Sequence, residues 1–156
     1  MDGAMKVRDL QTSDVQAVSP DTNLAAAAHI MWECDCGVVP VVDEKRTVVG
    51  MITDRDIAIA TTTRSAAPAD IQVRHVMSTG KLYSCRPDDD VRTALTTMGE
   101  YRVRRLPVTD RENRLVGILS LNDLVRRVNY RAGADVPGDE FIEALQSIST
   151  PTAVHA

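Results

Sequence analysis

An internal repeat constrains this chain more than any other feature of its sequence. When the chain is shifted by 67 positions, residues 12–57 superpose without a gap on residues 79–124. The superposed pairs include Pro40 with Pro107, Gly50 with Gly117 and Asp56 with Asp123. Proline, glycine and periodic apolar residues occupy positions where backbone geometry or burial is demanding. The repeat therefore predicts two copies of one supersecondary unit rather than a single undivided fold.

Both copies show the same order of expected elements. In the first, a short strand at 15–18 precedes a helix that starts near Pro20-Asp21-Thr22 and carries apolar residues at helical spacing. A strand at 38–42, a polar turn, a second strand at 47–52 and a helix from Asp54 follow. The second copy repeats this pattern, so each unit is β-α-β-β-α. The expected fold class is α/β (α+β).

The size of one copy suggests why two are present. A unit of about 60 residues buries only ~60% of its unfolded surface and is marginal alone, so two copies sharing an interface are expected. We predict the first repeat at 1–61, a small, polar, proline-containing linker at 62–72 and the second repeat at 73–131. Residues 132–156 form a tail with a short helix, in which Phe141 and Leu145 share an apolar face that docks on the repeats or on a partner.

Composition excludes several classes of protein. The formal charge of −4 gives no overall electrostatic reason to bind nucleic acid. No stretch approaches the ~20 apolar residues that a bilayer crossing needs, and residues 1–6 lack the basic-then-apolar layout of a secretory signal. The three cysteines are too few for a disulfide framework. We therefore expect a cytoplasmic protein with no membrane partner.

One short motif occurs in both copies, where the second hairpin strand meets the next helix. It consists of glycine, two apolar residues, Thr or Ser, two variable residues and Asp. In the first copy the hydroxyl residue is Thr53 and the final aspartate is Asp56, and in the second copy they are Ser120 and Asp123. On structural grounds alone, the hydroxyl residue is a helix N-cap and the aspartate completes a capping box. A carboxylate near a helix N-terminus can also accept hydrogen bonds from a vicinal diol.

The ordered set of strands, hairpin and motif, repeated at constant spacing over about 7–127, resembles a tandem pair of cystathionine-β-synthase (CBS) domains, or Bateman module. The resemblance implies two repeats related by a pseudo-twofold axis, with clefts between them that bind adenosine compounds such as AMP, ADP, ATP, S-adenosylmethionine or NAD. It also implies that Asp56 and Asp123 accept from ribose hydroxyls. Thr53 and Ser120 are then expected to contact ribose or phosphate.

The same resemblance places adenine between apolar walls, for which Val38, Val39 and Leu106 are the candidates. Basic residues before the corresponding strand contact phosphate in some CBS pairs, which makes Arg104 and Arg105 the phosphate candidates here. The matching stretch of the first repeat, residues 35–38, has no basic residue. We therefore expect one site to favour a phosphorylated ligand and the other to be weaker, vacant or selective for a less charged adenosine. A solvated basic edge paired with acidic turns is the alternative.

The functional expectation is a non-enzymatic, ligand-sensing regulatory module that acts on an unidentified effector protein and has no cofactor of its own. CBS modules pair through their helices, so Trp32 is a candidate homodimer contact, with a core position as the alternative. The rival functions are an interaction or structural module with empty clefts and, less favoured, a nucleic-acid-binding CBS protein. Cys34 and Cys36 are weak candidates for a metal or redox site, because a C-x-C pair without a second pair is poor evidence for zinc.

Overall fold

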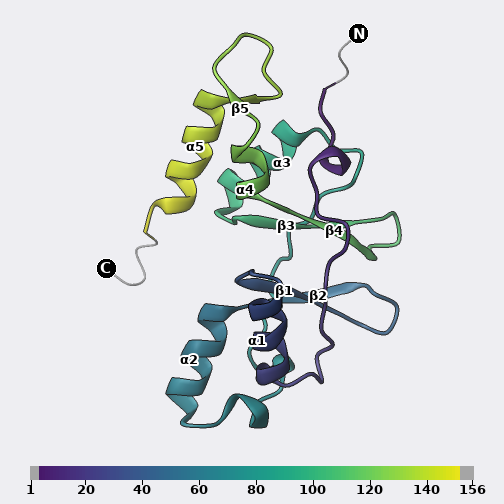
Figure 1. Ribbon diagram of the computed structural model, residues 1–156, viewed down its shortest axis with the longest axis vertical. Helices are drawn as coiled ribbons and strands as arrows, with labels where there is room; N and C mark the ends of the chain where they lie inside the picture. Colours follow the sequence, from purple (N-terminus) through teal and green to yellow (C-terminus); the bar gives the residue numbers. More distant parts are fainter. Residues whose placement is uncertain (1–3, 152–156) are drawn as a thin grey trace. The chain divides into compact units, whose positions relative to one another are not determined.

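The computed structural model describes residues 4–151, which form two compact units (Figure 1). The unit built around the first repeat comprises Asp14–Leu82 together with Arg111–Leu115, and we call it the first-repeat unit. The unit built around the second repeat comprises residues 4–13, Tyr83–Asp110 and residues 116–151, and we call it the second-repeat unit. Residues 152–156 of the expected tail and residues 1–3 lie outside the described part.

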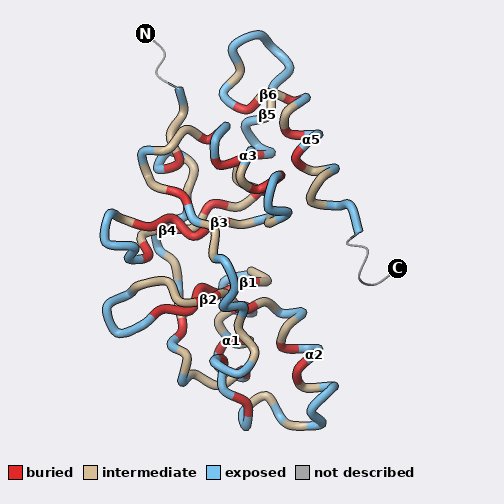
Figure 2. Tube along the Cα trace, turned by 180° about the vertical axis from the view of Figure 1, so that it is seen from behind, coloured by how far each residue is buried: buried red, intermediate tan, exposed pale blue. Residues whose placement is uncertain are grey.

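The first-repeat unit contains one helix, a hairpin and a second helix. The elements are α1 (Leu24–Glu33), β1 (Val38–Val42), β2 (Val48–Thr53) and α2 (Asp54–Arg64), followed by single 3-10 turns at Pro68–Asp70 and Val73–His75. Strands β1 and β2 pair antiparallel, with Val38 opposite Thr53. Leu24, Ala27 and Met31 of α1 pack on the inner residues of the hairpin, so the predicted apolar stripe is the buried face of α1. Helix α2 buries Ile57 and Ala60, and most of its other positions are exposed (Figure 2).

Two local predictions for this unit were wrong. The strand expected at 15–18 is reduced to one parallel bridge between Val18 and Val41. The first helix begins at Leu24 rather than near Pro20, because Asn23 is its N-cap and accepts a 2.9 Å hydrogen bond from the Ala26 N–H. Thr22, an equally suitable cap residue by type, instead accepts from the Ser19 N–H in the preceding turn.

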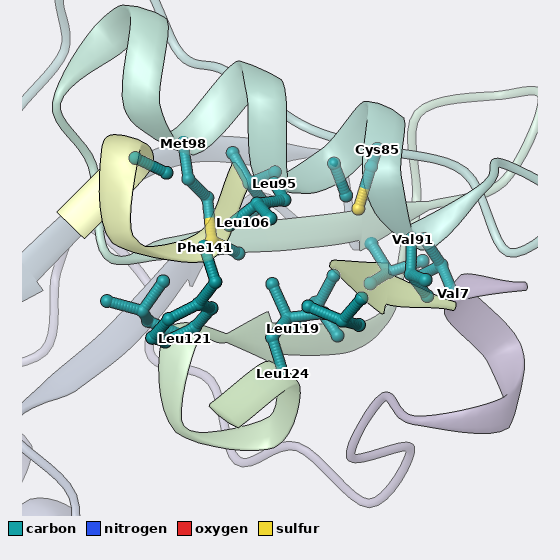
Figure 3. Packing of buried hydrophobic residues seen from close by; sticks show 14 residues of the cluster. Val7, Cys85, Val91, Leu95, Met98, Leu106, Leu119, Leu121, Leu124 and Phe141 are labelled. Carbon is teal, nitrogen blue, oxygen red and sulfur yellow. The ribbon is translucent and has the colours of Figure 1, made fainter. Parts of the chain in front are cut away.

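The second-repeat unit has the same order of elements and then an extension. The elements are α3 (Val91–Tyr101), β3 (Arg105–Thr109), β4 (Leu115–Ser120), α4 (Leu121–Val125), β5 (Val128–Asn129), β6 (Val136–Pro137) and α5 (Gly138–Ser149). The core lies between α3, the β3–β4 hairpin and α5. Figure 3 shows Phe141 of α5 among Met98, Leu106 and Leu121, so the predicted tail helix docks on its own repeat.

The short segment that precedes each repeat in the chain packs into the core built around the other repeat, and it is therefore part of that compact unit. Val7, in a 3-10 turn at Val7–Asp9, is fully buried in the second-repeat core and donates its N–H to the Asp89 carbonyl at 2.9 Å. Val73 is fully buried in the first-repeat core and donates to the Thr22 carbonyl at 2.8 Å. The residues expected to form a linker, 62–72, complete α2 and then bury Ile71.

The second helix of each repeat differs in length. Helix α2 runs for 11 residues, whereas α4 ends after 5. In the second-repeat unit, α5 supplies further helical packing against α3. None of the helices in the described part of the chain is both long enough and apolar enough to cross a membrane.

Candidate functional site

Both copies of the repeated motif form a capping box at the start of a helix, as predicted on structural grounds. At α2, the Asp56 N–H donates to Thr53 Oγ1 at 3.1 Å, and the Thr53 N–H donates to Asp56 Oδ2 at 2.9 Å. At α4, the Asp123 N–H donates to Ser120 Oγ at 3.2 Å and the Ser120 N–H donates to Asp123 Oδ2 at 2.8 Å. Each aspartate is therefore held in one orientation by the turn that it caps.

The capping box occupies only one oxygen of each carboxylate. Within residues 4–151, neither Asp56 Oδ1 nor Asp123 Oδ1 takes part in a hydrogen bond, and both residues are half-buried. A carboxylate has about four acceptor positions, so each aspartate can cap its helix and still accept from a ligand. Capping and ribose binding by these residues are compatible.

The chain segment just before β1 and β3 lies against the same helix start in each unit. The Asp54 N–H donates to the Gly37 carbonyl at 3.1 Å, and the equivalent Leu121 N–H donates to the Arg104 carbonyl at 2.9 Å. This bond brings the backbone of Arg104 next to the Ser120–Asp123 motif. The Arg104 side chain is exposed and that of Arg105 is half-buried. Among the described residues, neither side chain has a hydrogen-bond or ion-pair partner, so the acidic turns do not neutralise them.

The two motifs carry opposite local charge. Around the second motif, Arg102, Arg104 and Arg105 accompany the single acid Asp123. Around the first motif, three acids accompany a single base, and these residues are Asp35, Asp54, Asp56 and Arg55. The two motifs thus have the same backbone arrangement but opposite formal charge, positive around the second motif and negative around the first.

Asp54 and Gly37 are in close contact at the first motif. A Cβ placed on Gly37 would lie 3.0 Å from Asp54 Oδ2, so the carboxylate covers the position that a side chain would need. The corresponding residues in the second repeat are Leu121, which is buried, and Arg104. Helix α4 has only 5 residues, so the positive charge near the second motif comes mainly from the arginines.

The three candidate adenine contacts are buried. Val39 and Leu106 lie in the cores of their own units, with exposed fractions of 1% and 0%. Val38 is also buried, and alternation along β1 turns it to the face opposite Val39, beside Thr53. Of these three residues, Val38 is the one placed on the same face of its hairpin as a motif residue.

The three cysteines differ in their surroundings. Cys34 is exposed and Cys36 is half-buried, with its Sγ donating to the Val38 carbonyl at 3.4 Å. Cys85 is a core residue, as its alignment with Val18 predicts, and burial raises the pKa of its thiol to about 12. Over residues 4–151, no three His, Cys, Asp or Glu side chains are grouped so as to hold a metal ion.

A cavity of about 540 Å³ opens between α1 and α2 in the first-repeat unit. Ala28, Met31 and Ile57 form its apolar lining, and Trp32 stands at its edge with 84% of its surface exposed. The alternative that Trp32 is a core residue was therefore wrong. Sequence reasoning missed the cavity itself, because an apolar stripe does not show which of its residues remain uncovered.

Comparison with known proteins matches this arrangement to a known family. The CBS domain model matches residues 7–61 and 73–130. The CBS domain-containing protein YhcV of Bacillus subtilis is 41% identical over 118 residues, which cover 76% of this chain and 81% of YhcV.

Two solved structures illustrate the range of the fold. Hypoxic Response Protein I with two coordinated zinc ions superposes with a TM-score of 0.71 and 30% identity, covering 80% of this chain and 100% of that one. The CBS domain pair of MJ0100, in complex with 5′-methylthioadenosine and S-adenosyl-L-methionine, also has a TM-score of 0.71, with 25% identity over 80% of this chain and 95% of that one. On this evidence the chain belongs to the CBS domain family and contains two CBS domains in tandem.

Proposed function

We propose that this CBS pair is a regulatory sensor of adenosine compounds and not an enzyme. The observation that carries the proposal is the free Oδ1 oxygen of Asp56 and of Asp123, each fixed by a capping box at a helix start. A ribose diol offers two O–H donors, and a carboxylate in a fixed orientation can accept both. The complex of the MJ0100 CBS pair with two adenosine compounds supports this ligand class for a chain of the same fold.

The inverted charge of the two motifs supports different ligands at the two positions. Arg104 and Arg105 have no side-chain partner in the described part of the chain, so they can meet a phosphate group. The acids around Asp56 oppose an anion, which favours a neutral or cationic adenosine compound such as 5′-methylthioadenosine or S-adenosylmethionine. The second motif thus takes a phosphorylated nucleotide, and the first takes a less negative ligand.

Regulation follows from differential affinity. A ligand shifts a conformational equilibrium only as far as it binds one state better than the other, and the favoured state then changes the surface offered to an effector protein. Self-association through helix faces, with Trp32 as a contact, is part of this proposal. We place the module in the cytoplasm, where thiols such as Cys34 stay reduced.

The test is a thermal-shift screen with adenosine, AMP, ADP, ATP, NAD, 5′-methylthioadenosine and S-adenosylmethionine. A ligand at about 100 times its dissociation constant adds ~2.7 kcal/mol to the unfolding free energy. For a chain of this size, the melting temperature should rise by about 5–10 °C. GMP has the ribose and the phosphate of AMP but a different base, so it serves as a control for binding that does not depend on adenine. No shift with any adenosine compound would favour the interaction module with empty clefts.

The variants must separate ligand binding from helix capping. Alanine at Asp56 or Asp123 would remove both, so Asp56→Asn and Asp123→Asn are preferable because asparagine keeps one oxygen for the cap. We expect each variant to melt near the wild-type temperature without ligand and to lose the ligand-induced shift at its own motif. Arg104→Gln with Arg105→Gln should weaken AMP binding about tenfold or more and leave adenosine binding unchanged. Equal losses for AMP and adenosine would contradict the phosphate assignment.

A further inference from the structure

A cavity of about 340 Å³ lies at the C-terminal end of α4, within the second-repeat unit. The end of α4, the loop that joins β5 to β6 and Met5 of the N-terminal segment line this cavity, which we call the α4-end cavity. Its volume is at the lower end of the range for ligand sites, so it suits a small molecule. Of its described lining residues, none belongs to the Ser120–Asp123 motif, so the function proposed above leaves this cavity unused.

Hydrogen bonds and one buried side chain hold the loop of the α4-end cavity in place. Strands β5 and β6 pair in parallel, with Val128 opposite Val136, and Val136 is fully buried in the core. The loop between the two strands is largely exposed (Figure 2). Within it, the Ala134 N–H donates to the Arg131 carbonyl at 3.2 Å, and the Arg131 N–H donates to the side-chain oxygen of Asn129 at 3.0 Å. The loop is therefore shaped by its own contacts, and the cavity does not need a ligand to form.

Charges of both signs line the α4-end cavity without pairing. Arg126 and Arg127 contribute two guanidinium groups, Asp135 contributes a carboxylate, and all three residues are exposed. Over residues 4–151, none of these three side chains forms an ion pair or a hydrogen bond. Since the arginines and the aspartate share one small cavity and do not neutralise each other, each of them is available to a ligand that carries the complementary charge.

We propose that the α4-end cavity binds an acidic amino acid, glutamate or aspartate. The two arginines supply forked donors for two carboxylates, and Asp135 accepts from the ammonium group. The ligand thus carries two negative charges and one positive charge, which is the inverse of the lining. A neutral amino acid would leave one guanidinium without a partner, and a dicarboxylate without an ammonium group would only be repelled by Asp135. The inference does not rest on the function proposed above, because it uses none of the motif residues.

A titration followed by nuclear magnetic resonance tests this inference and locates the site. The full chain, labelled with ¹⁵N and free of nucleotide, is titrated at pH 7 with L-glutamate and in parallel with L-aspartate, at constant ionic strength. Because the charged lining residues are hydrated before binding, we expect a dissociation constant on the order of 1 mM. The amide signals that move should be those of the cavity, with Gly133 and Ala134 as reporters from the loop. Glutarate, which lacks the ammonium group, and L-glutamine, which lacks the second carboxylate, should each bind about tenfold more weakly.

Matched variants assign the groups of the ligand to side chains. Arg126→Gln and Arg127→Gln should each weaken glutamate binding about tenfold. Arg131→Gln should leave it unchanged, because Arg131 is an exposed arginine of the same loop that does not line the cavity. Asp135→Asn should weaken glutamate binding about tenfold and leave glutarate binding undiminished, because only glutamate has an ammonium group. Asp139→Asn is its control, since Asp139 is exposed and outside the lining. All of these positions are exposed, so the variants should fold as the wild type does.

The outcomes separate this inference from the adenosine proposal. If no cavity amide moves at about 20 mM glutamate or aspartate, the cavity is not a site for an acidic amino acid. If the moving signals centre on Arg104 and Arg105 instead, or if the arginine control weakens binding as much as the lining variants do, the choice of site is wrong. Equal binding of glutarate and glutamate would refute the role of Asp135 and with it the assignment to an amino acid. Asp123→Asn should leave glutamate binding unchanged, so either proposal can fail without the other.

Discussion

Replacing Gly99 with alanine should destabilise the chain, because the added methyl group has no space between α3 and α5. The new Cβ would lie 3.0 Å from Ala144 Cα and 3.1 Å from Ala144 Cβ, well inside the ~3.5–4.0 Å of an ordinary carbon contact. Overpacking of this kind costs about 1–3 kcal/mol. Alanine in a helix interior returns ~0.5–1 kcal/mol relative to glycine. We therefore expect a net loss of about 1 kcal/mol in the free energy of unfolding.

The assay is urea denaturation, accompanied by a melting temperature that should fall by ~2–4 °C. Ala144→Gly makes the matched variant, because it removes the methyl group on the facing helix. Alone it should cost about 2 kcal/mol, from helix propensity and a lost buried methyl. Together with Gly99→Ala it restores space at the contact, so the double variant should be more stable than the sum of the two losses predicts, by ~1–2 kcal/mol.

The opposite sign would refute the reasoning. If α5 did not lie on α3, position 99 would be an exposed helix site and Gly99→Ala would stabilise the chain by ~0.5–1 kcal/mol. Additive effects of the two substitutions would likewise show that Gly99 and Ala144 are not in contact.

Two further predictions concern the cores. Burial raises the pKa of the Cys85 thiol from 9.0 to about 12, so between pH 9 and 12 the unfolded chain loses a proton that the folded chain keeps, and stability should fall as pH rises through this range. At pH 10 the loss is about 1.4 kcal/mol, and Cys85→Val, which places in the second repeat the valine found at Val18 of the first, should lack this component in denaturation measured at pH 8 and 10. Val7→Ala should cost about 2 kcal/mol and speed amide hydrogen exchange in α3 more than in α1, whereas Val73→Ala should have the reverse preference. If Val7→Ala instead speeds amide hydrogen exchange in α1, the result would contradict the packing of Val7 in the core of the second-repeat unit.

Helix starts were predictable where a hydroxyl residue is followed by an aspartate three positions later, in the pattern of a capping box. Thr53 and Ser120 each follow an apolar strand and precede an aspartate at the third helical position, and both form the expected capping box. The start of α1 was misplaced because Asp21, Thr22 and Asn23 are all good cap residues, and the choice among them depends on tertiary contacts. Asp21 is used instead in an ion pair with Arg74.

The sequence pattern did not predict where the segments before each repeat and helix α5 pack. Val7 and Val73 precede their repeats at nearly the same spacing, and an apolar residue fits either core equally well, so sequence alone does not say which core each one enters. The docking of α5 depends on Gly99, whose significance appears only once Ala144 is placed against it. For the candidate site, the sequence predicted the motif residues and the arginines. The free carboxylate oxygens and the unpaired arginine side chains required coordinates.

The two capping boxes are not identical, and the difference bears on ligand choice. The Ser120 hydroxyl donates to Asp123 Oδ2 at 2.7 Å, so its proton is already used within the motif. The Thr53 hydroxyl accepts from the Asp56 N–H, and over residues 4–151 its own proton has no acceptor. Thr53 can therefore donate to a ribose or carboxylate oxygen of a ligand without breaking a bond.

At the second motif, a ligand that needed a hydroxyl donor would have to break the Ser120–Asp123 bond first. In the function that we propose, Arg104 and Arg105 would supply the donors there instead, since guanidinium groups bind anionic oxygens more strongly than a hydroxyl does. The Asp123 Oδ1 oxygen remains available for a diol. Hydrogen-bonding capacity thus agrees with formal charge, because the motif that lacks a free hydroxyl proton is the one with arginines. The phosphorylated adenosine that we propose for this motif would use both the arginines and the free oxygen of Asp123.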